Sequence, residues 1–134
     1  DLACDRIAAS ALADQVQTLA TETMANAPAG DVLLSRAAMA MEELAEWLTA
    51  HAQGDLMSAA DAWADRACIL FGDAVAGGLP VAELFAEVHR SNMTKESDSA
   101  GTGKAIKGPA YQSPDIRSMM RLDSLQANEE NGET

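Results

Sequence analysis

The chain has little of what a β-sheet protein needs. Of its 134 residues only 4% are aromatic, and β-branched residues are scarce. Those two classes favour strands, whereas the abundant alanine, leucine and methionine favour helices. The length suits one domain with a core of its own. The composition therefore predicts an all-α domain and argues against a sheet.

Positively charged residues are scarce in the first two thirds of the chain. Residues 1–89 contain three arginines and no lysine against fourteen acids, and the whole chain has a net charge of −12. Such a surface repels the phosphate backbone of a nucleic acid, so we expect no nucleic-acid partner unless a metal intervenes. Residues 90–134 hold six basic residues against seven acids, so this third could serve an anionic ligand.

Long apolar runs and cysteine pairs are also lacking. No stretch approaches eighteen unbroken apolar residues, and no charged-then-apolar leader precedes a cleavage site, so we expect neither a membrane span nor a signal peptide. Cys4 and Cys68 do not make a disulfide scaffold, and the apolar neighbours of Cys68 predict a buried free thiol. These features predict a cytoplasmic protein.

Apolar periodicity and turn residues divide the chain into helices. The predicted helices span residues 2–27, 31–52, 56–77 and 81–95, followed by a loop and a short extra helix over 114–125. Asp31 is the expected N-cap of the second helix, Gly54 its terminator, and Asp55 or Ser58 the next N-cap. Four principal helices joined by short turns predict a four-helix-bundle-like fold. We expect one domain over residues 1–127 and a disordered acidic tail over 128–134.

Spacing also predicts which side of the fourth helix is buried. On the first helix Ile7, Leu12 and Leu19 recur near helical spacing, and on the fourth helix Val81, Leu84, Phe85 and Val88 mark one side. We therefore expect the side chains of this fourth-helix set to be buried.

Two acidic segments lie at matching sequence distances on either side of Gly54. Glu43 and Asp65 are each eleven residues from this glycine, and Glu46 and Asp61 are eight and seven residues from it. If the chain folds back at Gly54, these acids reach matching heights on antiparallel helices. Such a density of like charge is unfavourable unless the acids face water or share a cation. With Glu42 the set holds only oxygen donors, which suit Mg²⁺ or Mn²⁺ rather than zinc.

At this point the chain resembles the all-α nucleoside triphosphate pyrophosphohydrolases of the MazG-like superfamily, over roughly residues 33–117. The family's EExxE motif is matched by Glu42-Glu43-Leu44-Ala45-Glu46, and the end of its ExxD motif by Ala64-Asp65. Two later segments resemble a bacterial and phage branch, and they read FAEVHRSNMTK at 85–95 and GKAIKGPAY at 103–111. One position departs from the pattern, because Ala62 stands where ExxD has its Glu. Asp61 lies one position earlier, about 100° around the helix, and it either substitutes for that Glu or only faces solvent.

The resemblance implies a MazG-type fold and cleavage of a nucleoside triphosphate between its α- and β-phosphates. The metal ligands it implies are Glu42, Glu43, Glu46 and Asp65, with Asp61 added by the substitution, and the metal is Mg²⁺ or alternatively Mn²⁺. Glu43 and Glu46 are the expected catalytic residues, and which carboxylate is the general base stays open. Family members usually complete their site with a second chain, so we expect a homodimer or a dimer of dimers.

The basic third would then serve the substrate. The expected substrate-binding residues are Arg90, Asn92, Lys95, Lys104, Lys107 and Tyr111, with Asn92 near metal or sugar and the lysines on phosphates. Two of these assignments have an alternative. Lys104 and Lys107 are otherwise ordinary exposed loop lysines, and Arg90 is otherwise a structural ion pair with Glu87 or Glu83.

Three functions compete at this stage. The branch resemblance favours deoxynucleotides, dUTP or dCTP first, in nucleotide-pool cleansing, and a phage-type enzyme specific for dGTP or dATP is the alternative. The second function is that of a non-enzymatic helical module that binds metal or a basic partner. A di-iron centre is the third, and the absence of histidine from both acidic motifs argues against it.

Overall fold

The computed structural model describes residues 4–97 and 104–120, and its elements confirm the all-α prediction. The helices are α1 (Arg6–Asn26), α2 (Val32–Gln53), α3 (Leu56–Ala76), α4 (Val81–Asn92) and α5 (Ile116–Met119). The one strand-like feature in the described residues is an isolated antiparallel bridge between Glu96 and Ile106. The chain divides into two compact units between Ala76 and Gly77, and each unit is described by itself.

The predicted capping residues begin and end the helices of the first unit. The Asp31 carboxylate accepts a hydrogen bond of 2.9 Å from the Leu34 N–H at the start of α2. Gly54 ends α2 with φ 76°, a left-handed conformation that favours glycine. The Asp55 carboxylate then accepts from the backbone N–H groups of Met57 and Ser58, both at 3.1 Å. The sharp turn that folds α3 back onto α2 is therefore encoded in the residues from Gly54 to Ser58.

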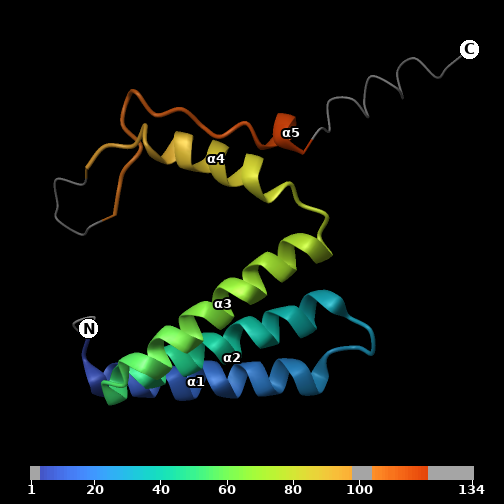
Figure 1. Ribbon diagram of the computed structural model, residues 1–134, viewed down its shortest axis with the longest axis vertical. Helices are drawn as coiled ribbons and strands as arrows, with labels where there is room; N and C mark the ends of the chain where they lie inside the picture. The colour runs from blue at the N-terminus through green and yellow to red at the C-terminus, as the bar shows by residue number, and fades with distance from the viewer. Residues whose placement is uncertain (1–3, 98–103, 121–134) are drawn as a thin grey trace, which may run out of the picture. The chain divides into compact units, whose positions relative to one another are not determined.

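Alanine makes the contacts between the helices of the first unit. Figure 1 shows α1, α2 and α3 side by side, and α2 packs against both of the others. The buried residues described in this unit are all alanine: Ala13, Ala20, Ala38, Ala45, Ala50, Ala59, Ala62 and Ala74. Because the distance between packed helices depends on the side chains at the contact, these small residues let the helix axes approach closely.

One long side chain also links α2 to α3. The Arg36 guanidinium forms an ion pair with Asp73 and donates a hydrogen bond of 2.8 Å to the Ile69 carbonyl oxygen. Gly72 makes room for it, since a Cβ atom at this position would lie 2.3 Å from Arg36 Nη2. Arg36 therefore fixes the α2–α3 contact at the end away from the Gly54 turn.

Several larger apolar side chains are exposed, and on α4 this contradicts the predicted buried side. Ile7 is 84% exposed, Leu12 48% and Leu19 53% on α1, and on α4 Phe85 is 72% exposed while Leu84 is partly buried. In the described part of the first unit only alanines are fully buried, so its larger apolar side chains are at most partly covered. The prediction of a buried Cys68 is also wrong, because both cysteines are free and exposed.

The second unit consists of α4 and the segment that returns along it. After the Glu96–Ile106 bridge the chain runs back beside α4 to α5 (Figure 1). The observed α5 is shorter than the predicted helix over 114–125, whose last residues lie outside the described part, as does the predicted tail over 128–134. Within the described ranges, no single helix has the length and apolar content needed to cross a membrane.

Candidate active site

Glu43 lies at the centre of the acidic side of the α2–α3 hairpin. Its side chain is partly buried, whereas the four other predicted metal ligands are exposed. Burial raises the pKa of Glu43 above its usual 4.5, and neighbouring negative charges raise it further. In decreasing order those neighbours are Glu46, Asp65, Glu42 and Asp61. The hairpin therefore brings acids from both helices into one electrostatic field, as the spacing around Gly54 predicts.

One oxygen of Glu43 has no hydrogen-bond donor. Its Oε2 atom is buried and makes no hydrogen bond within the described part of the chain. An unpaired buried acceptor costs about 1–3 kcal/mol and more when it is charged, so this atom favours a proton or a cation. A set of five carboxylates with a buried, unpartnered oxygen fits a hard divalent ion in donor chemistry.

The carboxylates do not form a ready coordination shell. Nowhere in residues 4–97 and 104–120 do three or more His, Cys, Asp or Glu side chains approach closely enough to hold one ion. Glu42, Glu46, Asp61 and Asp65 extend into solvent, which separates like charges. The structure thus places the five predicted ligands on neighbouring helices, and their joint binding of a metal stays a prediction.

The position at which the second acidic motif departs from ExxD is buried. Ala62 is 3% exposed and belongs to the alanine contact of α3. A glutamate there would put a carboxylate into the helix contact, where an unpaired charge is costly. Asp61 is exposed, and of the four acids that raise the pKa of Glu43 it contributes least. Asp61 is therefore on the acidic side but contributes less to the field at Glu43 than Asp65 does.

A polar cavity adjoins Glu46. Its volume is about 320 Å³, and it lies between α1, α2 and the first turn of α3. Its polar lining residues are Asp14, Gln17, Glu46, Thr49, Gln53 and Ser58. The α1 residues among them were not identified from the sequence, although Asp14 and Gln17 are three apart and hence neighbours on one side of a helix.

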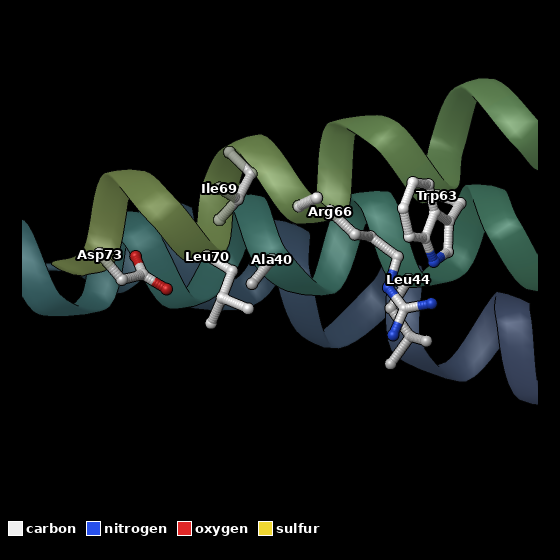
Figure 2. Close-up of a pocket in the computed structure, with 8 residues that line it drawn as sticks. Ala40, Leu44, Trp63, Arg66, Ile69, Leu70 and Asp73 are labelled. Atoms are coloured by element: carbon white, nitrogen blue, oxygen red, sulfur yellow. The ribbon is translucent and has the colours of Figure 1, made fainter. Parts of the chain in front are cut away.

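A second cavity lies between α2 and α3 and is mostly apolar. It measures about 380 Å³ and is lined by Ala40, Leu44, Trp63, Arg66, Ala67, Ile69, Leu70 and Asp73. Figure 2 shows Leu44, Trp63 and Leu70 along this groove. Trp63 is 62% exposed and Leu70 65%, so much of the groove's apolar surface faces solvent. The Arg66 guanidinium lies over the Trp47 ring, 4.8 Å from its centroid.

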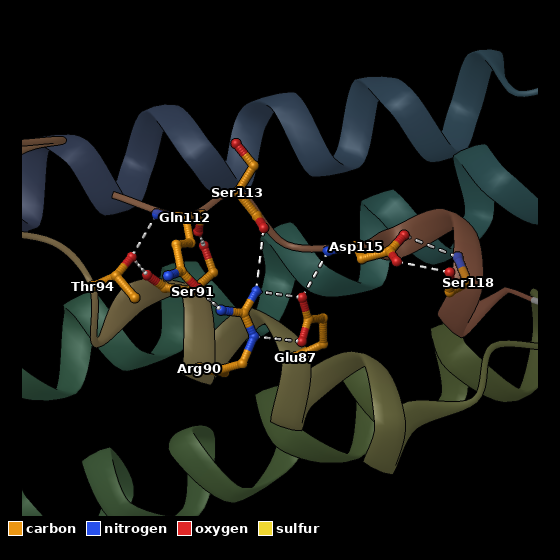
Figure 3. A network of polar contacts seen from close by, with 8 residues as sticks. All are labelled: Glu87, Arg90, Ser91, Thr94, Gln112, Ser113, Asp115 and Ser118. Atoms are coloured by element: carbon orange, nitrogen blue, oxygen red, sulfur yellow. Dashed lines mark hydrogen bonds and ion pairs between the residues drawn. The ribbon is translucent and has the colours of Figure 1, made fainter. Parts of the chain in front are cut away.

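In the second unit Arg90 forms an ion pair with Glu87. Its Nε and Nη2 atoms donate to the two Glu87 carboxylate oxygens at 2.8 and 2.7 Å (Figure 3). Its remaining contacts reach Gln112 Oε1 at 2.9 Å and the Ser113 carbonyl oxygen at 3.2 Å. Of the two predicted alternatives for Arg90, the structure has the ion pair, with Glu87 as the partner. The Arg90 guanidinium holds the pKa of Glu87 at about 2, helped by a hydrogen bond from the Asp115 N–H.

Two hydroxyl side chains of the same helix region hold the backbone of Gln112. Ser91, which is buried, donates a hydrogen bond of 2.7 Å to the Gln112 carbonyl oxygen. Thr94 Oγ1 accepts one of 2.9 Å from the Gln112 N–H. Both backbone groups of Gln112 are therefore paired with side chains, which fixes this segment on α4 (Figure 3).

The bridge between the two arms of the second unit places two predicted phosphate ligands opposite each other. Glu96 and Ile106 exchange both backbone hydrogen bonds, at 2.9 and 3.0 Å. The antiparallel register therefore makes Lys95 and Lys107 neighbouring positions across the bridge. Lys107 Nζ also lies over the Tyr111 ring, 4.8 Å from its centroid.

Tyr111 is tied to α4 through its hydroxyl. Hydrogen bonding to Ser91 is the main cause that lowers the pKa of Tyr111 below 10.0, and Ser113 and Lys107 add to it. Asn92 is exposed at the end of α4, and Lys104 is exposed before the bridge. The predicted substrate-binding residues thus belong to one unit and the predicted metal ligands to the other.

Of three comparisons with known proteins, one finds a match. A family model described as phosphoribosyl-ATP pyrophosphohydrolase matches residues 9–92, more than half of the chain. The matched range contains all five acids of the hairpin and ends at Asn92. No curated protein and no solved structure matches the chain.

Proposed function

This chain belongs to the phosphoribosyl-ATP pyrophosphohydrolase family of the MazG-like superfamily, and from that premise we propose that it hydrolyses a deoxynucleoside triphosphate to the monophosphate and pyrophosphate. The family accounts for the pyrophosphohydrolase chemistry and for a nucleotide-like substrate. The metal, the base and the assembly are proposals argued from the residues.

The observation that carries the proposal is the environment of Glu43. A partly buried carboxylate with an unpaired oxygen and four acids around it is unfavourable for the folded chain on its own. A divalent cation removes that cost, and Glu42, Glu43, Glu46, Asp65 and Asp61 are the residues that would hold it. When bound, Mg²⁺ or Mn²⁺ supplies positive charge to the phosphate oxygens and acidifies the attacking water. Glu43 and Glu46, three residues apart on α2, are the proposed catalytic residues, and one of the two would accept the proton of the attacking water.

The polar cavity beside Glu46 provides room for the base and sugar. Gln17 and Gln53 each offer a carbonyl acceptor and an amide donor, which suits the edge of a nucleobase. We propose dUTP or dCTP as the first substrates, in cleansing of the nucleotide pool, and dGTP or dATP as the alternative. A purine is the larger base, and a cavity of about 320 Å³ admits either ring system.

The lysines of the second unit are proposed to bind the phosphates. Like charges on directly opposed positions are unfavourable, and the bridge register makes Lys95 and Lys107 such a pair. A triphosphate relieves that repulsion, because its oxygens accept from both ammonium groups. Tyr111, Lys104 and Asn92 are proposed as further contacts to phosphate or sugar.

A second copy of the chain is proposed to cover the apolar side of the first unit. Trp63 and Leu70, which line the groove between α2 and α3, are each more than half exposed, and an apolar surface of this kind marks an interaction site. We propose a homodimer, or a dimer of dimers, built on this side. The two free thiols agree with the reducing cytoplasm as its compartment.

A substrate panel tests the proposed function. Common and damaged deoxynucleoside triphosphates are incubated with Mg²⁺ or Mn²⁺, and the products are identified. We expect monophosphate and pyrophosphate, with activity lowered about 10²-fold or more in Glu43→Gln and Asp65→Asn. Glu22→Gln, the same change on the exposed side of α1, is the control and should retain activity. No pyrophosphate from any nucleotide would favour the non-enzymatic module, and wild-type rates in both variants would overturn the site assignment.

A further inference from the structure

We propose that the Glu87–Arg90 pair is a positioning device for the phosphate-binding segment, holding residues 111–115 on α4 so that Lys107 keeps its place beside Lys95. The kinetic part of this inference rests on the proposed function. It assigns Arg90 a role different from a phosphate contact, and it adds Glu87, Ser91 and Gln112, which the family resemblance does not.

The bonding of Arg90 leaves little of it for a ligand. All three of its nitrogen atoms donate within the unit, to Glu87, Gln112 and Ser113. The Glu87 side chain is only 13% exposed, and its Oε1 atom also accepts a hydrogen bond of 2.7 Å from the Asp115 N–H. The pair therefore joins one turn of α4 to three residues of the returning segment (Figure 3).

The lysine that would meet the phosphates, Lys107, lies four residues before this segment. Gln112 is held through its side chain by Arg90 and through its backbone by Ser91 and Thr94. Tyr111, the preceding residue, lies under the Lys107 ammonium group, whose Nζ atom is 4.8 Å from the centroid of its ring. The Glu87–Arg90 pair is thus connected to Lys107 through Gln112 and the neighbouring Tyr111.

The geometry of the guanidinium is what this role requires. A planar group with donors on three nitrogen atoms reaches Glu87, Gln112 and Ser113 at once, whereas a lysine ammonium places its donors on one atom. Without the clamp, the segment must be ordered when the substrate binds, which weakens binding without altering the reacting groups. The consequence falls on KM rather than on kcat.

Steady-state kinetics of three variants test this role. Arg90→Lys keeps the charge, Glu87→Gln removes the carboxylate pair, and Gln112→Ala removes one acceptor. We expect KM for the triphosphate to rise about tenfold in Arg90→Lys and Glu87→Gln, and less in Gln112→Ala, with kcat within about twofold of wild type. Glu83→Gln is the matched control, since Glu83 is an exposed acid one turn earlier on α4 and makes no hydrogen bond in the described residues. Its KM should not change.

The single tyrosine of the chain gives a readout that does not depend on activity. Ultraviolet titration of Tyr111 in the intact protein should show its pKa moving up towards 10.0 in Arg90→Lys, and staying low in Glu83→Gln. A loss of folded protein alone would instead lower the apparent kcat and leave KM and the tyrosine titration of the folded fraction unchanged.

The outcomes separate the two proposals. An active wild type whose KM and tyrosine titration are unaffected by Arg90→Lys and Glu87→Gln would overturn the positioning role alone. A wild type that releases no pyrophosphate would overturn the proposed function, and the positioning role with it, whatever the titration shows.

Discussion

Replacing Glu43 by glutamine should stabilise the metal-free protein. The substitution keeps the size of the side chain but removes a negative charge that four neighbouring acids oppose. It also gives the buried Oε2 position a neutral amide group in place of an unpaired charged acceptor. Removing a charged group from a predicted active site would thus increase the free energy of unfolding.

The size of this effect follows from the number of like charges. Like-charge pairs on helix surfaces cost about 0.2–0.5 kcal/mol each, and Glu43 has four such neighbours on two helices. Because the neighbours are exposed and screened by solvent, we expect about 1 kcal/mol in total. For a domain of this length that corresponds to an increase in Tm of about 4 °C.

The pH dependence has a definite sign. The pKa of Glu43 in the folded chain lies above 4.5, its ordinary value, so the folded state keeps this proton at pH values at which the unfolded state has lost it. The free energy of unfolding therefore falls as the pH rises from 4.5 through the raised pKa of Glu43. Glu43→Gln should remove this part of the pH dependence.

Divalent metal should reverse the order of stability. A ligand that binds only the folded state adds about 2.7 kcal/mol at one hundred times its Kd. Wild type should gain this increment when Mg²⁺ or Mn²⁺ is added, whereas Glu43→Gln should gain little, because a proposed ligand is gone. The variant is thus the more stable protein in EDTA and the less stable one in saturating metal.

Thermal unfolding followed by circular dichroism, with EDTA and with added metal, measures both the stability of the metal-free protein and the gain from metal. Glu22→Gln removes the same charge from an exposed site on α1, and its Tm should follow wild type under both conditions. A Glu43→Gln protein that is less stable than wild type in EDTA would contradict the electrostatic argument. An equal gain from metal in both proteins would contradict the assignment of Glu43 as a ligand.

Three further predictions concern other parts of the chain. The pKa of Glu87 is about 2, below its ordinary 4.5, so its ion pair should stabilise the second unit above pH 4.5. This stabilisation should be lost as the pH falls towards 2. Hydrogen exchange of the 108–118 segment should show the loss in wild type and not in Glu87→Gln. Gly72→Ala should destabilise wild type because the new Cβ displaces Arg36. In an Arg36→Ala background the same change should stabilise the protein by about 1 kcal/mol through helix propensity, which a double-mutant cycle by chemical denaturation measures. Destabilisation in both backgrounds would exclude the steric explanation. Trp63→Ser and Leu70→Ser should convert the proposed dimer to a monomer in light scattering, and an unchanged mass in both would move the interface elsewhere.

The helices were largely predictable because their ends are marked by residues with local effects. Asp31, Gly54 and Asp55 act through hydrogen bonds and backbone conformation within their own turn, and the structure has each as predicted. Burial was not predictable in the same way. The apolar stripe on α4 predicts a buried side, but Phe85 within it is 72% exposed, because a stripe alone does not reveal whether another element of the chain covers it.

In the candidate site, too, features that depend on local sequence were predictable and features that depend on tertiary packing were not. The matched distances from Gly54 were sufficient to place acids of α2 and α3 in one field, because a tight turn leaves antiparallel helices little freedom of register. The sequence restricts the ion-pair partner of Arg90 to two acids of the same helix, Glu87 or Glu83, but the contacts of Arg90 with Gln112 and Ser113 depend on a return of the chain that no local pattern encodes. The lining of the polar cavity by Gln17 likewise depends on how α1 packs against α2.

The alanine contact and the acidic cluster depend on each other. Helices that meet through Ala59 and Ala62 on α3 approach closely enough for Asp65 to affect the pKa of Glu43 on α2. The same closeness excludes a glutamate at position 62, so the second acid of α3 must occupy a position beside the contact, and Asp61 does. Larger residues at these alanines would separate the helices, weaken the field at Glu43 and leave room for the missing Glu. Alanine in place of the Glu of ExxD therefore goes together with the close packing of the two acidic helices.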